Sequence, residues 1–227
     1  MKLKYLFIFS LAICSILVIF CSCVSTEKPD EFIVDVNSPN IRIGEIEAQF
    51  FKPLFPGLRK ESIEVFYYPR EDAVSLRYRQ DFITYNQFWN RTGRQAFLTA
   101  LAQYNEAFNA RTLTNNRKSR KAYGTVLGYL VWQSQSYTVQ GRSNMDVDIG
   151  YDFRERLPYF RVNQGKAEFK NPNIPANDRT SPDNPMFFTR AQAAELAILF
   201  EQHFLQQVNM PEGPPPRDPT IGRDDDY

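Results

Sequence analysis

Residues 63–83, IEVFYYPREDAVSLRYRQDFI, decide the expected fold because two strand-like runs flank a short turn. From Val74 to Ile83 apolar and polar residues alternate, which is the two-residue period of a strand with one buried face. The run before the turn, residues 63–68, is rich in β-branched and aromatic residues. Polar residues 70–72 separate the two runs. The stretch therefore predicts an antiparallel strand hairpin.

Two helices and a second group of strands are expected after this hairpin. Residues 92–110 place apolar side chains at helical spacing on a single stripe. Residues 124–132 are apolar on both faces, as in a strand at the centre of a sheet. Shorter strand-like runs follow at 145–153, 158–162 and 166–170.

A last helix is expected to begin at Thr189, which forms a capping-box sequence with Gln192. The order is then a strand hairpin, a helix, a meander of three to four strands and a helix. This order predicts an α+β fold, in which an antiparallel sheet has helices packed on one face.

A long uncharged segment opens the chain. No charged residue lies between Lys4 and Glu27, and Lys2 and Lys4 precede the apolar block, which is the layout of a secretory signal. The segment is also long enough to span a bilayer. Under both interpretations the residues from Glu27 onward leave the cytoplasm, because the basic end stays inside.

All three cysteines, Cys14, Cys21 and Cys23, lie in or beside this segment. The rest of the chain contains none, so structural disulfides and cysteine-ligated zinc are excluded there. A bridge between Cys21 and Cys23 would be strained, because residues two apart in an extended chain lie near the upper limit of disulfide geometry.

Residues Phe20, Cys21, Ser22 and Cys23 resemble a bacterial lipobox, in the relaxed form of spirochaetal lipoproteins. The resemblance covers about the first 25 residues and implies cleavage before Cys23. Fatty acyl chains such as palmitate would then anchor the protein to a membrane outside the cytoplasm, in the periplasm or at the cell surface. An uncleaved membrane anchor and an ordinary cleaved signal are the alternatives.

The predicted organisation has four parts. Residues 1–22 are a lipoprotein signal peptide, 23–31 a tether, 32–209 a single α+β domain, and 210–227 a tail. The tail has five prolines in 18 residues and three consecutive aspartates near its end, which predicts a disordered extension.

Charge limits the class of partner. Without Lys2 and Lys4, 25 basic residues remain against 26 acidic ones, and this balance argues against binding of nucleic acid. The exception is the basic run RKSRK at residues 117–121. A solvated loop is the favoured interpretation, and contact with anionic lipid headgroups or another polyanion is the alternative.

One polar face is a candidate site. A hairpin loop at residues 140–144 would pair Val131 with Phe153 and place the apolar residues of the flanking strands on one face. The polar face opposite to it could be the solvent side of a sheet, or it could bind a sugar, peptide or cation through an aromatic platform and carboxylates. The opposite, polar face would carry Trp132, Ser134, Ser136 and Thr138 across from Asp146, Asp148 and Asp152.

No catalytic residue, cofactor or metal site is expected. Past Cys23 the chain has no cysteine and a single histidine, and it lacks the G-x-S-x-G and phosphate-loop motifs. We therefore expect a membrane-anchored envelope lipoprotein that acts as a non-catalytic module binding an envelope protein or glycan. One alternative is a hydrolase of envelope glycans that uses Asp146 and Asp148. The other is a membrane-active lipoprotein with exposed aromatic residues at positions 66–68.

Overall fold

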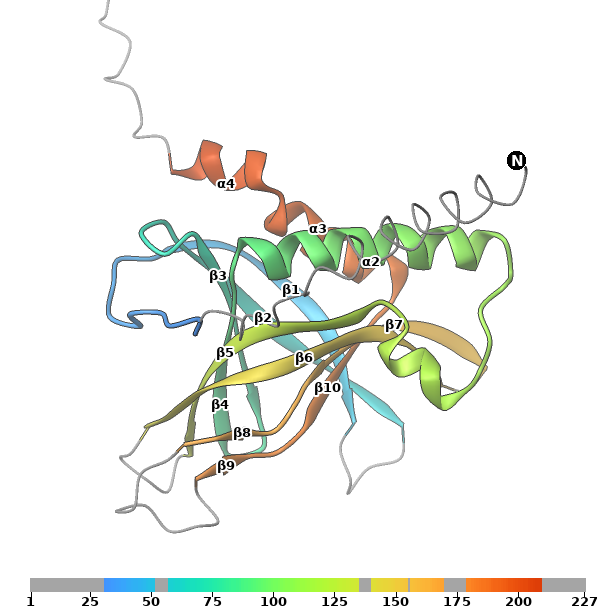
Figure 1. Cartoon of the computed structure of the whole chain (residues 1–227), viewed down its shortest axis with the longest axis horizontal. Helices are drawn as coiled ribbons and strands as arrows, with labels where there is room; N and C mark the ends of the chain where they lie inside the picture. The colour runs from blue at the N-terminus through green and yellow to red at the C-terminus, as the bar shows by residue number, and fades with distance from the viewer. Residues whose placement is uncertain (1–30, 52–56, 135–139, 155, 170–178, 210–227) are drawn as a thin grey trace, which may run out of the picture. The chain divides into compact units, whose positions relative to one another are not determined.

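Eight antiparallel strands form a closed barrel in the computed structural model of this chain (Figure 1). Around the barrel the order is β1-β10-β7-β6-β5-β4-β3-β2, and β8 and β9 form a separate two-stranded sheet. The structure describes residues 31–51, 57–134, 140–154, 156–169 and 179–209. The barrel strands are β1 (Ile41–Phe51), β2 (Leu58–Tyr68), β3 (Ala73–Gln80), β4 (Ile83–Trp89), β5 (Gly124–Ser134), β6 (Gln140–Arg154), β7 (Leu157–Gln164) and β10 (Asn184–Phe188). The small sheet pairs β8 (Ala167–Glu168) with β9 (Thr180–Ser181).

The closed barrel shows that the expected α+β sheet with helices on one face is wrong. The predicted hairpin is present as β2 and β3, but β3 ends at Gln80, and Ile83 already begins β4. Closure comes from β1 and β10, where Gln49 lies opposite Phe187. Inward and outward side chains alternate along the strands of an open sheet and of a barrel alike. The sequence period therefore does not distinguish the two.

Side chains fill the interior of the barrel. The rings of Tyr78 and Tyr85 stack with centroids 5.2 Å apart. The Tyr78 hydroxyl donates to Gln164 Oε1 at 2.7 Å, and Gln164 Nε2 donates to Ser181 Oγ at 3.2 Å. An eight-stranded barrel is just wide enough for such packing, so this interior forms the core.

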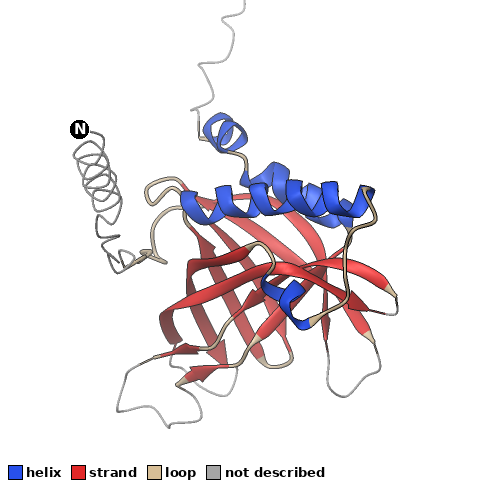
Figure 2. Cartoon of the chain, turned by 45° about the vertical axis from the view of Figure 1, so that its right-hand side comes forward, coloured by secondary structure: helices blue, strands red, loops and turns tan. Residues whose placement is uncertain are grey.

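Helices cover one end of the barrel (Figure 2). They are α2 (Arg91–Asn109), α3 (Arg190–Phe200) and α4 (Gln202–Val208). The ring of Phe97 in α2 lies edge-on to Phe160 and to Phe200, with centroids 5.2 and 5.0 Å apart. The predicted capping box of Thr189 and Gln192 is confirmed at the start of α3. The predicted last helix, however, is interrupted at Glu201, whose extended backbone separates α3 from α4.

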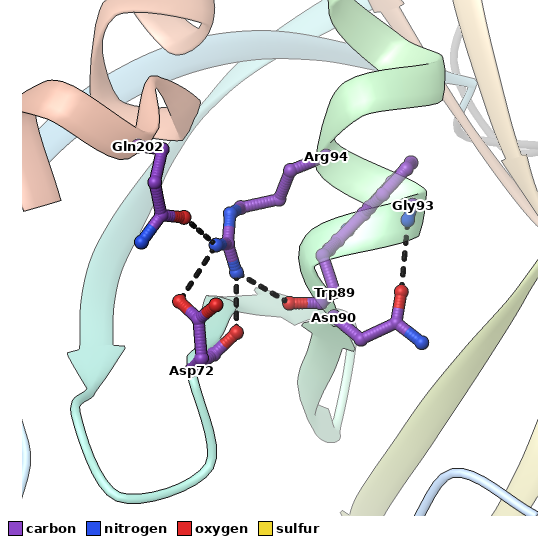
Figure 3. A network of polar contacts seen from close by, with 6 residues as sticks. All are labelled: Asp72, Trp89, Asn90, Gly93, Arg94 and Gln202. Carbon is purple, nitrogen blue, oxygen red and sulfur yellow. Dashed lines mark hydrogen bonds and ion pairs between the residues drawn. The ribbon is translucent and has the colours of Figure 1, made fainter.

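A buried arginine joins the helices to a strand turn (Figure 3). Arg94, 1% exposed, donates from one terminal nitrogen to Asp72 Oδ1 and to Gln202 Oε1, both at 2.8 Å. Its other terminal nitrogen donates to the carbonyl oxygen of Asp72 at 2.6 Å. Because these partners lie in the β2–β3 turn and in α4, Arg94 fixes α2 and α4 relative to the barrel.

The segment before β1 packs on the outside of the barrel. Val34 is buried there, and Phe32 and Val36 pack beside it. They cover an outer apolar cluster that includes Phe66 and Tyr68. The alternative in which the aromatic residues at positions 66–68 are exposed is therefore wrong, since all three are buried. We call residues 32–36 the N-terminal strap.

Several predicted parts lie outside the described residues. They are the signal segment with Cys23, residues 23–30 of the tether, and the tail 210–227. The four-part organisation of the chain therefore stays a prediction. Among the helices of the described ranges, none is both long and apolar enough to cross a membrane.

Candidate binding groove

The register of β5 against β6 differs from the predicted one. Val131 lies opposite Arg142 instead of the predicted Phe153, a shift of eleven residues, and the connection follows Ser134 and ends at Gln140. Side chains alternate between the two faces of a strand, so a register shift by an odd number of residues places β6 side chains on the opposite face from the predicted one, relative to β5. The prediction failed because β5 is apolar on both faces. Its hydrophobic pattern therefore does not fix its register.

The predicted polar face is consequently not assembled. Trp132 points into the barrel core with Met145 and Val147, whereas Asp146 and Asp148 lie on the outer face of β6. Trp132 therefore cannot serve as a stacking platform beside the aspartates. Of the predicted hydroxyl residues, Ser134 ends β5, and Ser136 and Thr138 lie outside the described residues.

The basic run forms a short 3-10 helix, η1 (Arg117–Lys121), on the outer surface of the barrel (Figure 2). It lies directly on β6 at Gly150, where a Cβ atom would come 2.3 Å from the carbonyl oxygen of Ser119 and 2.6 Å from that of Arg120. Only glycine allows so close an approach of two backbones. A glycine inside a strand was the sequence signal for this contact, and it was missed.

Two of the predicted aspartates bind this basic helix. Lys121 Nζ lies 3.0 Å from Asp148 Oδ2, and Thr125 Oγ1 donates to Asp148 Oδ1 at 2.7 Å. Arg120 Nε lies 3.3 Å from Asp152 Oδ2. Asp148 and Asp152 are both buried, so these pairs hold η1 against the barrel. Within the described ranges, no three potential metal ligands gather into one group.

A groove of about 780 Å³ lies between η1 and the outer faces of β6 and β7. Its lining combines six cationic residues with three carboxylates, Asp146, Asp148 and Asp183. In the part of the chain that the structure describes, four of the groove's six cationic residues form no ion pair, since only Arg120 and Lys121 do. We call this site the charged groove; its cationic residues are Arg117, Lys118, Arg120, Lys121, Arg161 and Lys166.

Arg161 is the most informative of these cations. One of its terminal nitrogens donates to the carbonyl oxygen of Arg120 at 3.1 Å. Partial burial lowers the pKa of Arg161 and the charge of Arg120 lowers it further, whereas Asp152 and Asp148 act in the opposite direction. An arginine stays protonated even so, and a partly desolvated cation without a carboxylate partner is stabilised by a bound anion. Arg161 was not predicted, because a single arginine on a strand is an ordinary surface residue.

The comparisons with known proteins identify one family. No curated protein and no solved structure matches this chain. The family described as "Uncharacterised Treponema protein" matches residues 40–207, about three quarters of the 227 residues. The matched range includes the barrel strands, η1 and every residue of the charged groove. The chain therefore belongs to this family of uncharacterised Treponema proteins.

Proposed function

We propose that this protein is a non-catalytic binding module, held at a membrane of the cell envelope by lipid on Cys23, and that it binds an anionic ligand in the charged groove. The observation that carries the proposal is Arg161, a half-buried guanidinium without an ion pair in the described residues. Arg117, Lys118 and Lys166 line the same groove. The volume of about 780 Å³ lies within the range of small-molecule sites.

Binding is favoured over hydrolysis by the state of the carboxylates. An inverting glycosidase needs one carboxyl group to protonate the leaving oxygen and another to activate water. In the pair considered for this role, Asp146 and Asp148, both oxygens of Asp148 already have partners. Asp148 therefore supports η1, and the expected catalytic pair is reduced to Asp146 alone.

The membrane anchor is supported by the sequence of residues 20–23 and by the short connection that follows. Cys23 precedes Glu31, the first described residue, by eight positions, and eight extended residues reach at most about 28 Å. The N-terminal strap then packs on the barrel around Val34. A lipid on Cys23 would thus hold the barrel within reach of the membrane surface, where envelope glycans and lipid headgroups are concentrated.

A titration tests the binding proposal. The full-length protein in neutral detergent is titrated with inorganic phosphate, and the affinity is compared with that of Arg161→Gln. We expect about tenfold weaker binding for the variant, the effect of removing one charge-assisted hydrogen bond. Arg79→Gln is the matched control, since Arg79 is an exposed arginine on β3 outside the groove. Equal loss of affinity in both variants, or no phosphate binding by the wild type, would contradict the proposal.

The anchor is tested separately by intact-mass analysis of protein extracted from membranes. We expect an N-terminus at Cys23 and a mass increase equal to two or three acyl chains. An unacylated N-terminus beyond residue 23 would exclude lipid anchoring and leave the binding proposal in place.

A further inference from the structure

Asn163 supplies an acceptor that nothing in the described residues uses. It lies on β7 between Asp148 of β6 and Pro185 of β10, lines the charged groove and is 8% exposed. Its Oδ1 is buried and has no hydrogen-bond partner in the described part of the chain. Pro185 has no backbone N–H to offer. Most buried polar atoms have a partner, so this oxygen marks a position where a ligand can donate a hydrogen bond.

Two further acceptors line the same groove. Asp146 and Asp183 are exposed, and within the described ranges neither forms an ion pair. A ligand that carries only acceptor oxygens, such as a sulfate ion, would be attracted by Arg161 but repelled by these carboxylates. Hydroxyl groups on the ligand would remove the conflict, because a hydroxyl donates to carboxylate and amide oxygens.

We infer that the ligand of the charged groove is an anion that also carries several hydroxyl groups, as in a sugar phosphate or a uronic acid. This inference rests on the proposed function and names its ligand class. The anionic group lies against Arg161, and the hydroxyls donate to Asn163 and to Asp146 or Asp183. The terminal torsion of an asparagine is broad, so the amide of Asn163 can rotate to present Oδ1 to a ligand. A soluble glycan and the headgroup of an inositol phospholipid both present this chemistry.

Two phosphates of similar ring size separate the hydroxyl contribution from that of charge. Glucose 6-phosphate carries ring hydroxyls, and cyclohexylmethyl phosphate carries none. We expect the full-length protein to bind glucose 6-phosphate about tenfold more tightly, the contribution of one or two satisfied hydrogen bonds. Arg161→Gln should weaken the binding of both probes.

Asn163→Leu tests the amide directly. The variant should bind glucose 6-phosphate about tenfold less tightly and cyclohexylmethyl phosphate unchanged, because only the first probe donates to Oδ1. Its melting temperature should equal or exceed that of the wild type, since an apolar residue of similar shape replaces an unsatisfied polar group. Asp183→Asn is the second variant, at an exposed site. It removes a negative charge that repels the phosphate of both probes but a charged acceptor that only glucose 6-phosphate uses, so the ratio of the two affinities should fall.

The outcomes distinguish this inference from the proposed function. Equal affinity for the two probes would overturn the inference and leave anion binding intact, whereas failure of both probes would overturn both. A large fall in the melting temperature of Asn163→Leu would indicate a structural role and also overturn the inference. Cosedimentation of Cys23→Ser protein with phosphatidylinositol vesicles but not phosphatidic acid vesicles would support the inference with a lipid headgroup as ligand. Binding of free glucose 6-phosphate without cosedimentation would support it with a glycan.

Discussion

Replacing Gly150 with alanine should displace η1 and disturb the charged groove. The added Cβ atom would lie 2.3 Å from the carbonyl oxygen of Ser119 and 2.5 Å from the carbonyl carbon of Arg120. Carbon and oxygen atoms in contact are normally separated by about 3.3 Å, so η1 has to move outward by about 1 Å. Both atoms belong to the backbone, so that no side-chain rotation can relieve the clash.

The expected cost follows from this displacement. Moving η1 by about 1 Å would stretch the pairs of Arg120 with Asp152 and Lys121 with Asp148 beyond direct contact, and exposed or half-exposed pairs are worth about 0.5 kcal/mol each. Overpacking adds about 1 to 3 kcal/mol. We expect Gly150→Ala to lower the free energy of unfolding by about 2 kcal/mol. We also expect it to weaken phosphate binding, because Arg161 donates to the displaced carbonyl group of Arg120.

Urea unfolding followed by tryptophan fluorescence measures the first effect, and calorimetric titration with phosphate measures the second. Gly44→Ala is the matched control, because its Cβ would meet only the flexible end of Leu199, at 2.9 Å. This control should lose less than about 1 kcal/mol and keep its affinity. Unchanged stability and affinity in Gly150→Ala would refute the placement of η1 on β6.

Three further predictions concern the helices, the pH dependence of stability and the anchor. Arg94→Leu should lower the free energy of unfolding in urea by about 3 kcal/mol, because Asp72 and Gln202 lose a buried charged partner; a loss below about 1 kcal/mol would contradict this role. Burial raises the pKa of Tyr104 to about 12, so its contribution to stability is complete below pH 10 and is lost as the pH rises through 12. Urea midpoints between pH 9 and 12 should therefore fall less steeply for Tyr104→Phe than for the wild type, and equal slopes would show that Tyr104 does not contribute. Cys23→Ser should move the protein from the membrane fraction to the soluble fraction on carbonate extraction, whereas retention in the membrane would favour an uncleaved anchor.

Local elements were predictable from the sequence, but their assembly was not. The alternation after Val74 and the stripe of residues 92–110 correspond to β3 and α2. Both were predictable because the spacing of apolar residues along a short stretch of sequence distinguishes a strand from a helix. Barrel closure depends on β1 meeting β10, as in the pair Gln49 and Phe187, which are far apart in the sequence. No local pattern encodes that contact.

The candidate site was predicted only in pieces. The basic run 117–121 and the aspartates were recognised as separate features, and their meeting depends on the close approach at Gly150. Trp132 was placed on the wrong face, because β5 offers apolar residues to both faces and its register is set by the whole barrel. Arg161 and Asn163 carried no sequence signal. They stand out because, among the described residues, Arg161 has no ion pair and Asn163 Oδ1 has no hydrogen-bond donor, and the sequence shows neither.

The most direct test is an NMR titration that observes arginine side chains. Isotope-labelled protein in neutral detergent is titrated with glucose 6-phosphate, and the Nε–Hε resonance of Arg161 is assigned by its loss in Arg161→Lys. We predict that this resonance shifts saturably with the largest change among the arginines. Saturable shifts confined to arginines outside the charged groove, or no shifts at any arginine, would contradict anion binding at this site.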